Sequence, residues 1–165
     1  MSELQQRLHE LFEYRDGDLY WKVDRGSQKC KGKKAGTPTS KGYLAFRVRE
    51  LGGSMLVHRA VWIMQHGEAP DRLDHINGNP LDNRIENLRP ASRSQNGYNR
   101  PVAAHNTSGV KNVSWCKTKN KWSVTVSVSG KKKWFGYYND IELAEMVATE
   151  VRNKYHGEFA CHRSL

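Results

Sequence analysis

Four polar side chains in the centre of the chain could bind a divalent metal ion and activate a water molecule. Asp74 and His75 are adjacent, and Asn87 and Asn96 follow them in the same polar region. Carboxylate and amide oxygens, such as those of Asp74 and Asn96, are hard donors that suit Mg²⁺, which binds few protein atoms and keeps several waters. His75 titrates near neutral pH and could act as a general base on water. The Asn87 side-chain oxygen could accept from one ring N–H and fix the tautomer of that base.

The same residues also have a plainer interpretation. An Asp–His pair is often a surface ion pair, and asparagine is common in turns. Neighbouring residues of a strand point to opposite faces, so Asp74 and His75 can serve one site only if the strand twists or bends. Spacing alone therefore leaves a catalytic site and a polar surface loop both open.

The local sequence predicts a β–β–α unit around these residues. Two short apolar segments, 73–76 and 85–89, flank a loop rich in turn-forming residues and are expected to pair as a hairpin. Ser92 and Gln95 have the spacing of a capping box, so a helix should begin directly after Ser92 and carry Asn96 on its first turn. The first strand would hold the Asp–His pair, the second strand Asn87, and the helix Asn96.

Other elements are expected on both sides of this unit. Alternation and helical spacing predict, in chain order, a helix over 3–13, strands over 19–23, 44–49 and 54–57, and a helix over 58–67. After a linker at 101–107, we expect three strands and a helix that stops at Gly157. His156, at the end of that helix, is expected to be a charged imidazolium that complements the helix dipole.

The composition favours a polyanionic partner. Among the 165 residues, 27 are Lys or Arg and 17 are Asp or Glu, which gives a formal net charge of +10. The basic residues are concentrated in two stretches without acids, 25–49 and 101–133. No apolar run is long enough for a transmembrane helix, and the first residues do not resemble a signal peptide. The three cysteines form no CxxC pair, so we do not expect a zinc knuckle or a disulfide framework. The expected setting is a reducing cytoplasm.

Residues 56–100 resemble the HNH nucleases of the His-Me, or ββα-metal, superfamily, in the branch found in phages and group I introns. The matching residues are Val57, His58, Arg59, Asp74 to Asn79, Asn83, Arg84, Glu86 to Arg89, and Ser94 to Asn96. The resemblance implies that His75 is the general base, that Asn87 orients it, and that Asp74 and Asn96 bind one divalent ion, Mg²⁺ or Mn²⁺. It further implies hydrolysis that leaves 5′-phosphate and 3′-hydroxyl ends.

Residues 108–160 resemble an AP2 DNA-binding domain of the kind fused to such nucleases. The matching residues are Ser108 to Trp115, Lys121, Trp122, Phe135 to Tyr138, Ala144, and His156 to Ala160. The resemblance implies a three-stranded sheet in the DNA major groove with a helix packed behind it. Across both regions, the residues expected to contact DNA are Arg47, Arg49, Arg59, Arg93, Lys111, Trp115, Lys121, Ser123, Thr125, Ser127 and Lys131.

Together these patterns predict an α+β protein: a nuclease domain over 1–100 with a basic β-rich N-terminal extension and a ββα-metal core, a linker over 101–107, and an AP2-like domain over 108–165. The predicted activity is metal-dependent cleavage of double-stranded DNA by a phage-encoded homing-type endonuclease, a monomer or homodimer, in the host cytoplasm. Neither a membrane nor a small-molecule cofactor is expected. The alternatives are a catalytically silent DNA-binding regulator and a phage nuclease that acts on branched DNA or RNA. Because the four central residues precede the linker, residues 1–104 are expected to keep weak cleavage on their own.

Overall fold

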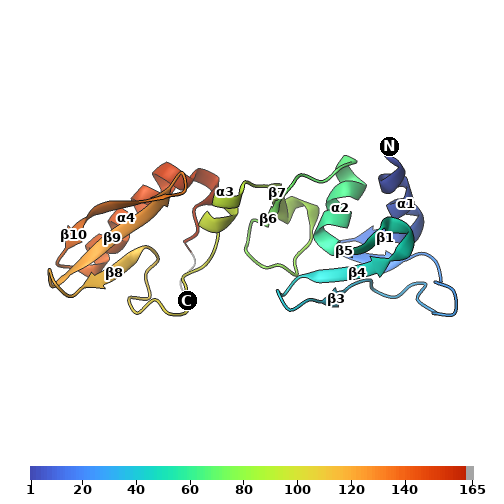
Figure 1. The fold of residues 1–165 in the computed structure, drawn as a ribbon, viewed down its shortest axis with the longest axis horizontal. Coiled ribbons are helices and arrows are strands. Elements are labelled where there is room, and N and C mark those ends of the chain that lie inside the picture. The colour runs from blue at the N-terminus through green and yellow to red at the C-terminus, as the bar shows by residue number, and fades with distance from the viewer. Residues whose placement is uncertain (163–165) are drawn as a thin grey trace. The chain divides into compact units, whose positions relative to one another are not determined.

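The computed structural model describes residues 1–162 and contains small sheets and several helices, as expected of an α+β protein (Figure 1). Its residue contacts divide it into two compact units, Met1–Pro90 and Ala91–Leu165. The division falls before the domain boundary predicted at residue 100, and helix α3 (Arg93–Tyr98) belongs to the second unit. Within the described residues, no helix combines the length and the apolar character that a membrane crossing requires.

The first unit begins with a helix that leads directly into a β-hairpin. The Ser2 hydroxyl caps the helix by accepting a hydrogen bond from the Gln5 backbone N–H (3.2 Å). The sequence predicts this helix to residue 13, but the chain becomes extended at Phe12 and forms a strand that the pattern did not reveal. Asp16 and Gly17 turn the hairpin with φ values of 47° and 91°, which two-residue hairpin turns require. These elements are α1 (Glu3–Leu11), β1 (Phe12–Arg15) and β2 (Asp18–Trp21).

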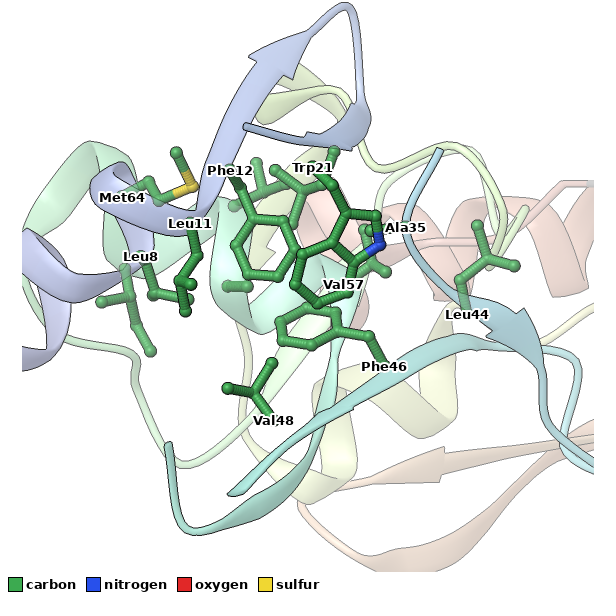
Figure 2. Close-up of a cluster of buried hydrophobic side chains, with 14 of the residues drawn as sticks. Leu8, Leu11, Phe12, Trp21, Ala35, Leu44, Phe46, Val48, Val57 and Met64 are labelled. Carbon is green, nitrogen blue, oxygen red and sulfur yellow. The ribbon is translucent and has the colours of Figure 1, made fainter. Parts of the chain in front are cut away.

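A three-stranded antiparallel sheet and a second helix complete the core of the first unit. Figure 2 shows the rings of Phe12, Trp21 and Phe46 gathered at its centre, with Phe12 4.4 Å from Trp21 and 4.6 Å from Phe46 between ring centroids. The predicted strands and the predicted helix that ends at Gly67 are confirmed to within about two residues. The elements are β3 (Thr37–Pro38), β4 (Leu44–Val48), the 3₁₀ turn η1 (Arg49–Leu51), β5 (Gly53–Leu56) and α2 (Val57–His66), with sheet order β3–β4–β5.

The predicted central hairpin is confirmed, although its strands are short. β6 (Leu73–His75) pairs antiparallel with β7 (Leu88–Pro90), so that Asp74 lies opposite Arg89 and His75 opposite Leu88. Residues 85–87 form a 3₁₀ turn, η2 (Ile85–Asn87), instead of the start of the second strand. Asn87 therefore ends a tight turn and does not lie within a strand.

In the second unit, three strands and a helix follow α3 in the predicted order. The sheet order is β10–β9–β8, with both pairs antiparallel. Val124 and Val126 of β9 are fully buried against Ala144 and Ala148 of the long helix, whereas the alternate residues of β9 remain partly exposed. This matches the predicted alternation. The elements are β8 (Val113–Cys116), β9 (Lys121–Val128), β10 (Lys131–Tyr138), α4 (Ile141–His156) and η3 (Gly157–Phe159).

Tyr98, the last residue of α3, is held by the rest of the second unit. Its ring stacks on the His156 ring at 3.7 Å with only 5° between the planes. Its hydroxyl accepts from the Ser129 backbone N–H (3.1 Å), and its carbonyl accepts from Lys111 Nζ (2.6 Å), which also donates to the Arg100 carbonyl. Three separate segments of the second unit therefore fix the C-terminal end of α3.

His156 differs from the sequence expectation because it is buried. Its Nε2 donates to the Ser127 carbonyl (2.7 Å), and burial lowers the pKa of the ring. An uncharged imidazole that stacks on Tyr98 replaces the predicted imidazolium at the helix C-terminus. The desolvation cost of a charged ring at this position outweighs its attraction to the helix dipole.

Candidate active site and DNA-binding surface

His75, the predicted base, is the last residue of β6 and is only 5 % exposed. Its Nε2 lies 3.2 Å from the side-chain oxygen Oδ1 of Asn83. The Asn83 Nδ2 donates to the Leu81 carbonyl (3.2 Å), which identifies the other amide atom as the oxygen. An amide oxygen can only accept, so we assign the ring proton to Nε2 and the lone pair of the neutral ring to Nδ1.

The environment of His75 keeps the ring uncharged at neutral pH. Burial lowers its pKa, and the hydrogen bond to Asn83 and the charges of Asp74 and Asp82 only partly oppose this effect. Asp82 is itself paired with Arg84, whose hydrogen bonds lower the pKa of Asp82 to about 2. A neutral imidazole is the form that can accept a proton from water.

Asn83 bonds to the His75 ring, whereas Asn87, which the sequence analysis predicted to orient that ring, bonds to the loop that follows β6. Asn87 Oδ1 accepts from the Asn77 backbone N–H (3.0 Å), and its Nδ2 donates to Asn77 Oδ1 (3.1 Å) and to the Asp82 carbonyl (2.7 Å). Asn87 thus closes the loop that follows β6. The hydrogen bond to the His75 ring that the structure shows is made by Asn83, and the orienting role of Asn87 stays a prediction. The sequence contains Asn83 in the matching motif, but nothing in a polar loop reveals that this side chain is buried.

Replacing Asn83 with alanine is expected to destabilise the first unit by about 1–3 kcal/mol, because the buried Nε2–H of His75 loses its acceptor. Asn83 is only 1 % exposed, so water does not readily take its place. The measurement is urea unfolding followed through amide signals of the first unit. Gln6→Ala, which removes an exposed amide from α1, is the control and should change stability by less than about 0.5 kcal/mol. Equal effects of the two changes would contradict the assignment of the Asn83–His75 bond.

Asp74, the predicted metal ligand, is buried in an ion pair that the sequence did not indicate. Arg89 donates to Asp74 Oδ2 from Nε (3.0 Å) and from Nη2 (2.9 Å), across the two strands of the hairpin. Both side chains are largely enclosed. The guanidinium balances the charge of a carboxylate that lies next to the base in the chain.

The donor chemistry fits a hard divalent cation with few protein ligands. Within residues 1–162, no three His, Cys, Asp or Glu side chains form a cluster that could hold a metal ion. Mg²⁺ does not need such a cluster, since one or two protein oxygens and several waters suffice. Asp74 offers a carboxylate, and the other predicted ligand, Asn96, offers an amide on the first turn of α3. The predicted capping box of Ser92 and Gln95 at the start of that helix is confirmed.

The predicted DNA contacts in the first unit have different surroundings. Arg47 on β4 and Arg49 on η1 are exposed. Arg59 instead donates from Nη1 to the carbonyls of Pro70 (2.9 Å) and Asp71 (3.3 Å), so it fixes the connection between α2 and β6. In the second unit, Arg93 is exposed at the start of α3.

The sheet of the second unit has one face covered by α4 and one face without a helix. Directly opposed residues share a face. By the observed register, Ser123, Thr125 and Ser127 share the uncovered face with Lys121, Ser114, Lys132, Trp134 and Tyr137. Trp134 is 59 % exposed, and its ring contacts that of Tyr137 at 5.1 Å. A bulge between Trp134 and Gly136 shifts the alternation of β10, so the sequence pattern does not reveal that Tyr137 shares this face.

Three predicted DNA contacts lie elsewhere in the second unit. Trp115 is paired with Trp122, and Lys131 with Val128, on the face that α4 covers. The Lys111 ammonium binds the end of α3. The uncovered face therefore retains Lys121 and the three hydroxyl residues of β9 from the predicted set.

Comparison with known proteins matches residues 55–98 to the family described as HNH endonuclease. Protein 3.8 of Escherichia phage T7 is 38 % identical over 110 residues, which span 64 % of this chain and 88 % of the relative. An uncharacterized HNH endonuclease, L560, of Acanthamoeba polyphaga mimivirus is 29 % identical over 116 residues, which span 68 % of this chain and 59 % of that protein. No solved structure matches. The segment that holds the buried His75, its partner Asn83 and the Asp74–Arg89 pair is thus the matched segment, and the chain belongs to the HNH endonuclease family, with its HNH domain at residues 55–98.

Proposed function

We propose that the protein is a metal-dependent endonuclease of the homing type that hydrolyses phosphodiester bonds in double-stranded DNA. The observation that carries the proposal is a buried, uncharged His75 whose Nε2 proton is committed to Asn83, within the HNH match and beside Asp74. The net charge of +10 supports a polyanionic substrate. The relative in phage T7 supports a phage origin.

In the proposed reaction, His75 Nδ1 takes a proton from water as the water oxygen bonds to phosphorus. The bond between phosphorus and the 3′ oxygen breaks, and the leaving oxygen gains a proton from solvent, which gives 5′-phosphate and 3′-hydroxyl ends. Asn83 holds the ring in the required tautomer, and Asn87 holds the adjoining loop. Asp74 and Asn96 would hold one Mg²⁺ or Mn²⁺ ion, which supplies charge stabilisation at the phosphate and at the leaving oxygen.

The second unit is proposed to bind DNA as an AP2-like domain through its uncovered sheet face. The paired rings of Trp134 and Tyr137, the hydroxyls of β9, and Lys132 offer apolar, hydrogen-bonding and cationic contacts on one surface. Such a surface combines phosphate binding with contacts to base edges. The exposed Arg47, Arg49 and Arg93 would add phosphate contacts.

Replacing Lys132 with alanine is expected to weaken DNA binding and to reduce the slope of log affinity against log salt by about one. The adjacent Lys133 is the matched control, because its register places it on the α4 face and its Nζ lies 5.8 Å from the Tyr155 ring. Lys133→Ala should leave the salt slope nearly unchanged. Binding titrations at two salt concentrations measure both effects. Equal losses for the two lysines would show that net charge, and not this sheet face, binds the DNA.

The test of the proposed function is incubation of the purified protein with supercoiled plasmid, with Mg²⁺ and with a chelator. Relaxed circles would show nicking by single active sites, and linear DNA would show paired cuts by two sites or by two successive events. Either product, formed only with the metal, supports the proposal. Intact plasmid under all conditions, with DNA binding preserved, would overturn it in favour of a silent DNA-binding regulator.

A further inference from the structure

The rings of Tyr43, His58 and His75, which come from separate parts of the first unit, lie in contact with one another. The His58 ring lies 5.1 Å from the His75 ring, nearly perpendicular to it at 81°. The Tyr43 ring lies 5.3 Å from His58 and 6.0 Å from His75. His58 is on the first turn of α2, and Tyr43 precedes β4, outside the residues 55–98 that match the HNH family. Edge-to-face packing of this kind is a favoured arrangement of aromatic rings.

His58 is enclosed and carries no charge at neutral pH. It is 6 % exposed, and burial is the main cause that lowers its pKa to about 4. The neighbour of His75 is thus a neutral ring, which does not oppose the uptake of a proton by His75 through charge repulsion.

The structure shows aromatic packing for the His58 ring but no hydrogen bond for its Nδ1 atom. Nδ1 is buried and has no hydrogen-bond partner among the described residues. Buried side chains that serve through a hydrogen bond normally show that bond. The contacts that the structure shows for the His58 side chain are thus ring contacts, with His75 and Tyr43.

We propose that His58, supported by Tyr43, is a positioning residue that fixes the plane of the His75 imidazole. The bond to Asn83 places the ring proton on Nε2, and the edge-to-face contact with His58 restrains the plane of the ring. The inference rests on the proposed function, in which His75 Nδ1 must be aligned with the attacking water. A displacement of about 1 Å in such a group lowers the rate by about 10²-fold.

Two substitutions at position 58 distinguish the role of the aromatic ring from the role of the Nδ1 atom. His58→Phe keeps a ring and removes the nitrogen, and we expect kcat close to that of the wild type. His58→Asn keeps a polar atom near the position of Nδ1 and removes the ring, and we expect kcat to fall about 10²-fold with little change in KM. His66→Ala, an exposed histidine of the same helix, is the control and should cleave as the wild type does.

A spectroscopic readout tests the inference without cleavage. The ¹⁵N shifts of His75 in the full chain should report one Nε2–H tautomer in the wild type and in His58→Phe, and a mixture in His58→Asn. Where His58→Phe does not fold, Tyr43→Phe and Tyr43→Leu provide the same contrast: the phenylalanine variant should match the wild type in kcat and tautomer, and the leucine variant should not.

Several outcomes would overturn the positioning role. A folded His58→Phe protein that fails to cleave, beside an active wild type, would show that the His58 nitrogen takes part in the chemistry. An Asn variant with wild-type kcat and one His75 tautomer would show that the ring contact is dispensable. An inactive wild type would instead refute the proposed function, and the tautomer measurement would still decide whether His58 positions His75.

Discussion

Replacing His75 with alanine is expected to abolish strand cleavage while DNA affinity stays nearly unchanged. A general base contributes to the transition state and little to ground-state binding, and one such group accelerates a reaction by roughly 10²–10⁴-fold. His75 is also enclosed, with its Nε2 bonded to Asn83, so alanine leaves a cavity as well as removing the base. A second variant must therefore separate lost chemistry from lost packing.

His75→Gln provides that separation. A glutamine amide nitrogen can reach the position of the imidazole Nε2 and donate to Asn83, but glutamine cannot take a proton from water near neutral pH. We expect both variants to be inactive on supercoiled plasmid, and the glutamine variant to unfold at nearly the wild-type denaturant concentration. His66→Ala serves as the active control, since that side chain is exposed at the end of α2. Cleavage by a folded His75→Gln protein at the wild-type rate would remove His75 from the mechanism.

Local signals in the sequence predicted much of the secondary structure around the site. The capping box of Ser92 and Gln95 places the start of α3, because both of its hydrogen bonds lie within four residues. The hairpin of β6 and β7 follows from two apolar segments on either side of a turn-rich loop. The buried alternation of β9 is visible as well, since one face of that strand packs on a helix.

The partners of the site residues were less predictable, because burial and pairing depend on the folded chain. The Asp74–Arg89 pair depends on the register of a short hairpin, in which a slip of one residue moves each side chain to the other face. The contact of Tyr43 with His58 joins segments that no local pattern connects. Asn83 and Asn87 look alike in a polar loop, and only the fold shows which one meets the His75 ring.

Removing residues 105–165 is expected to end metal-dependent cleavage, although the sequence alone predicts that residues 1–104 keep a weak activity. The reason lies within the second unit. Tyr98 at the end of α3 is held by Lys111, Ser129 and His156, all of which the truncation removes. α3 has only six residues, and an isolated helix of that length is marginal in water even with its capping box. Asn96, the proposed ligand on that helix, then loses its fixed position.

Asn96→Ala in the full chain sets the expected level of the defect. If α3 unfolds in the 1–104 fragment, the fragment should cleave plasmid no faster than full-length Asn96→Ala at any Mg²⁺ concentration. Tyr98→Ala in the full chain should fall between the wild type and that variant, because it removes the stacking on His156 and the bond from Ser129 but keeps the Tyr98 carbonyl that Lys111 binds. Tyr155→Ala, a tyrosine of α4 whose ring contacts Phe135, is the matched control and should keep wild-type metal dependence.

Comparing the 1–104 fragment with the full-length Asn96→Ala and Tyr98→Ala variants also shows what the second unit contributes to cleavage. A second unit that only binds DNA would leave a fragment whose weak cleavage is restored at high protein concentration, since mass action compensates for lost affinity. A second unit that holds α3 would leave a fragment whose defect no concentration of protein or DNA corrects, and Tyr98→Ala would reproduce part of that defect with DNA affinity intact. Recovery of the wild-type rate by the 1–104 fragment at high concentration would therefore show that α3 keeps its structure without Lys111, Ser129 and His156.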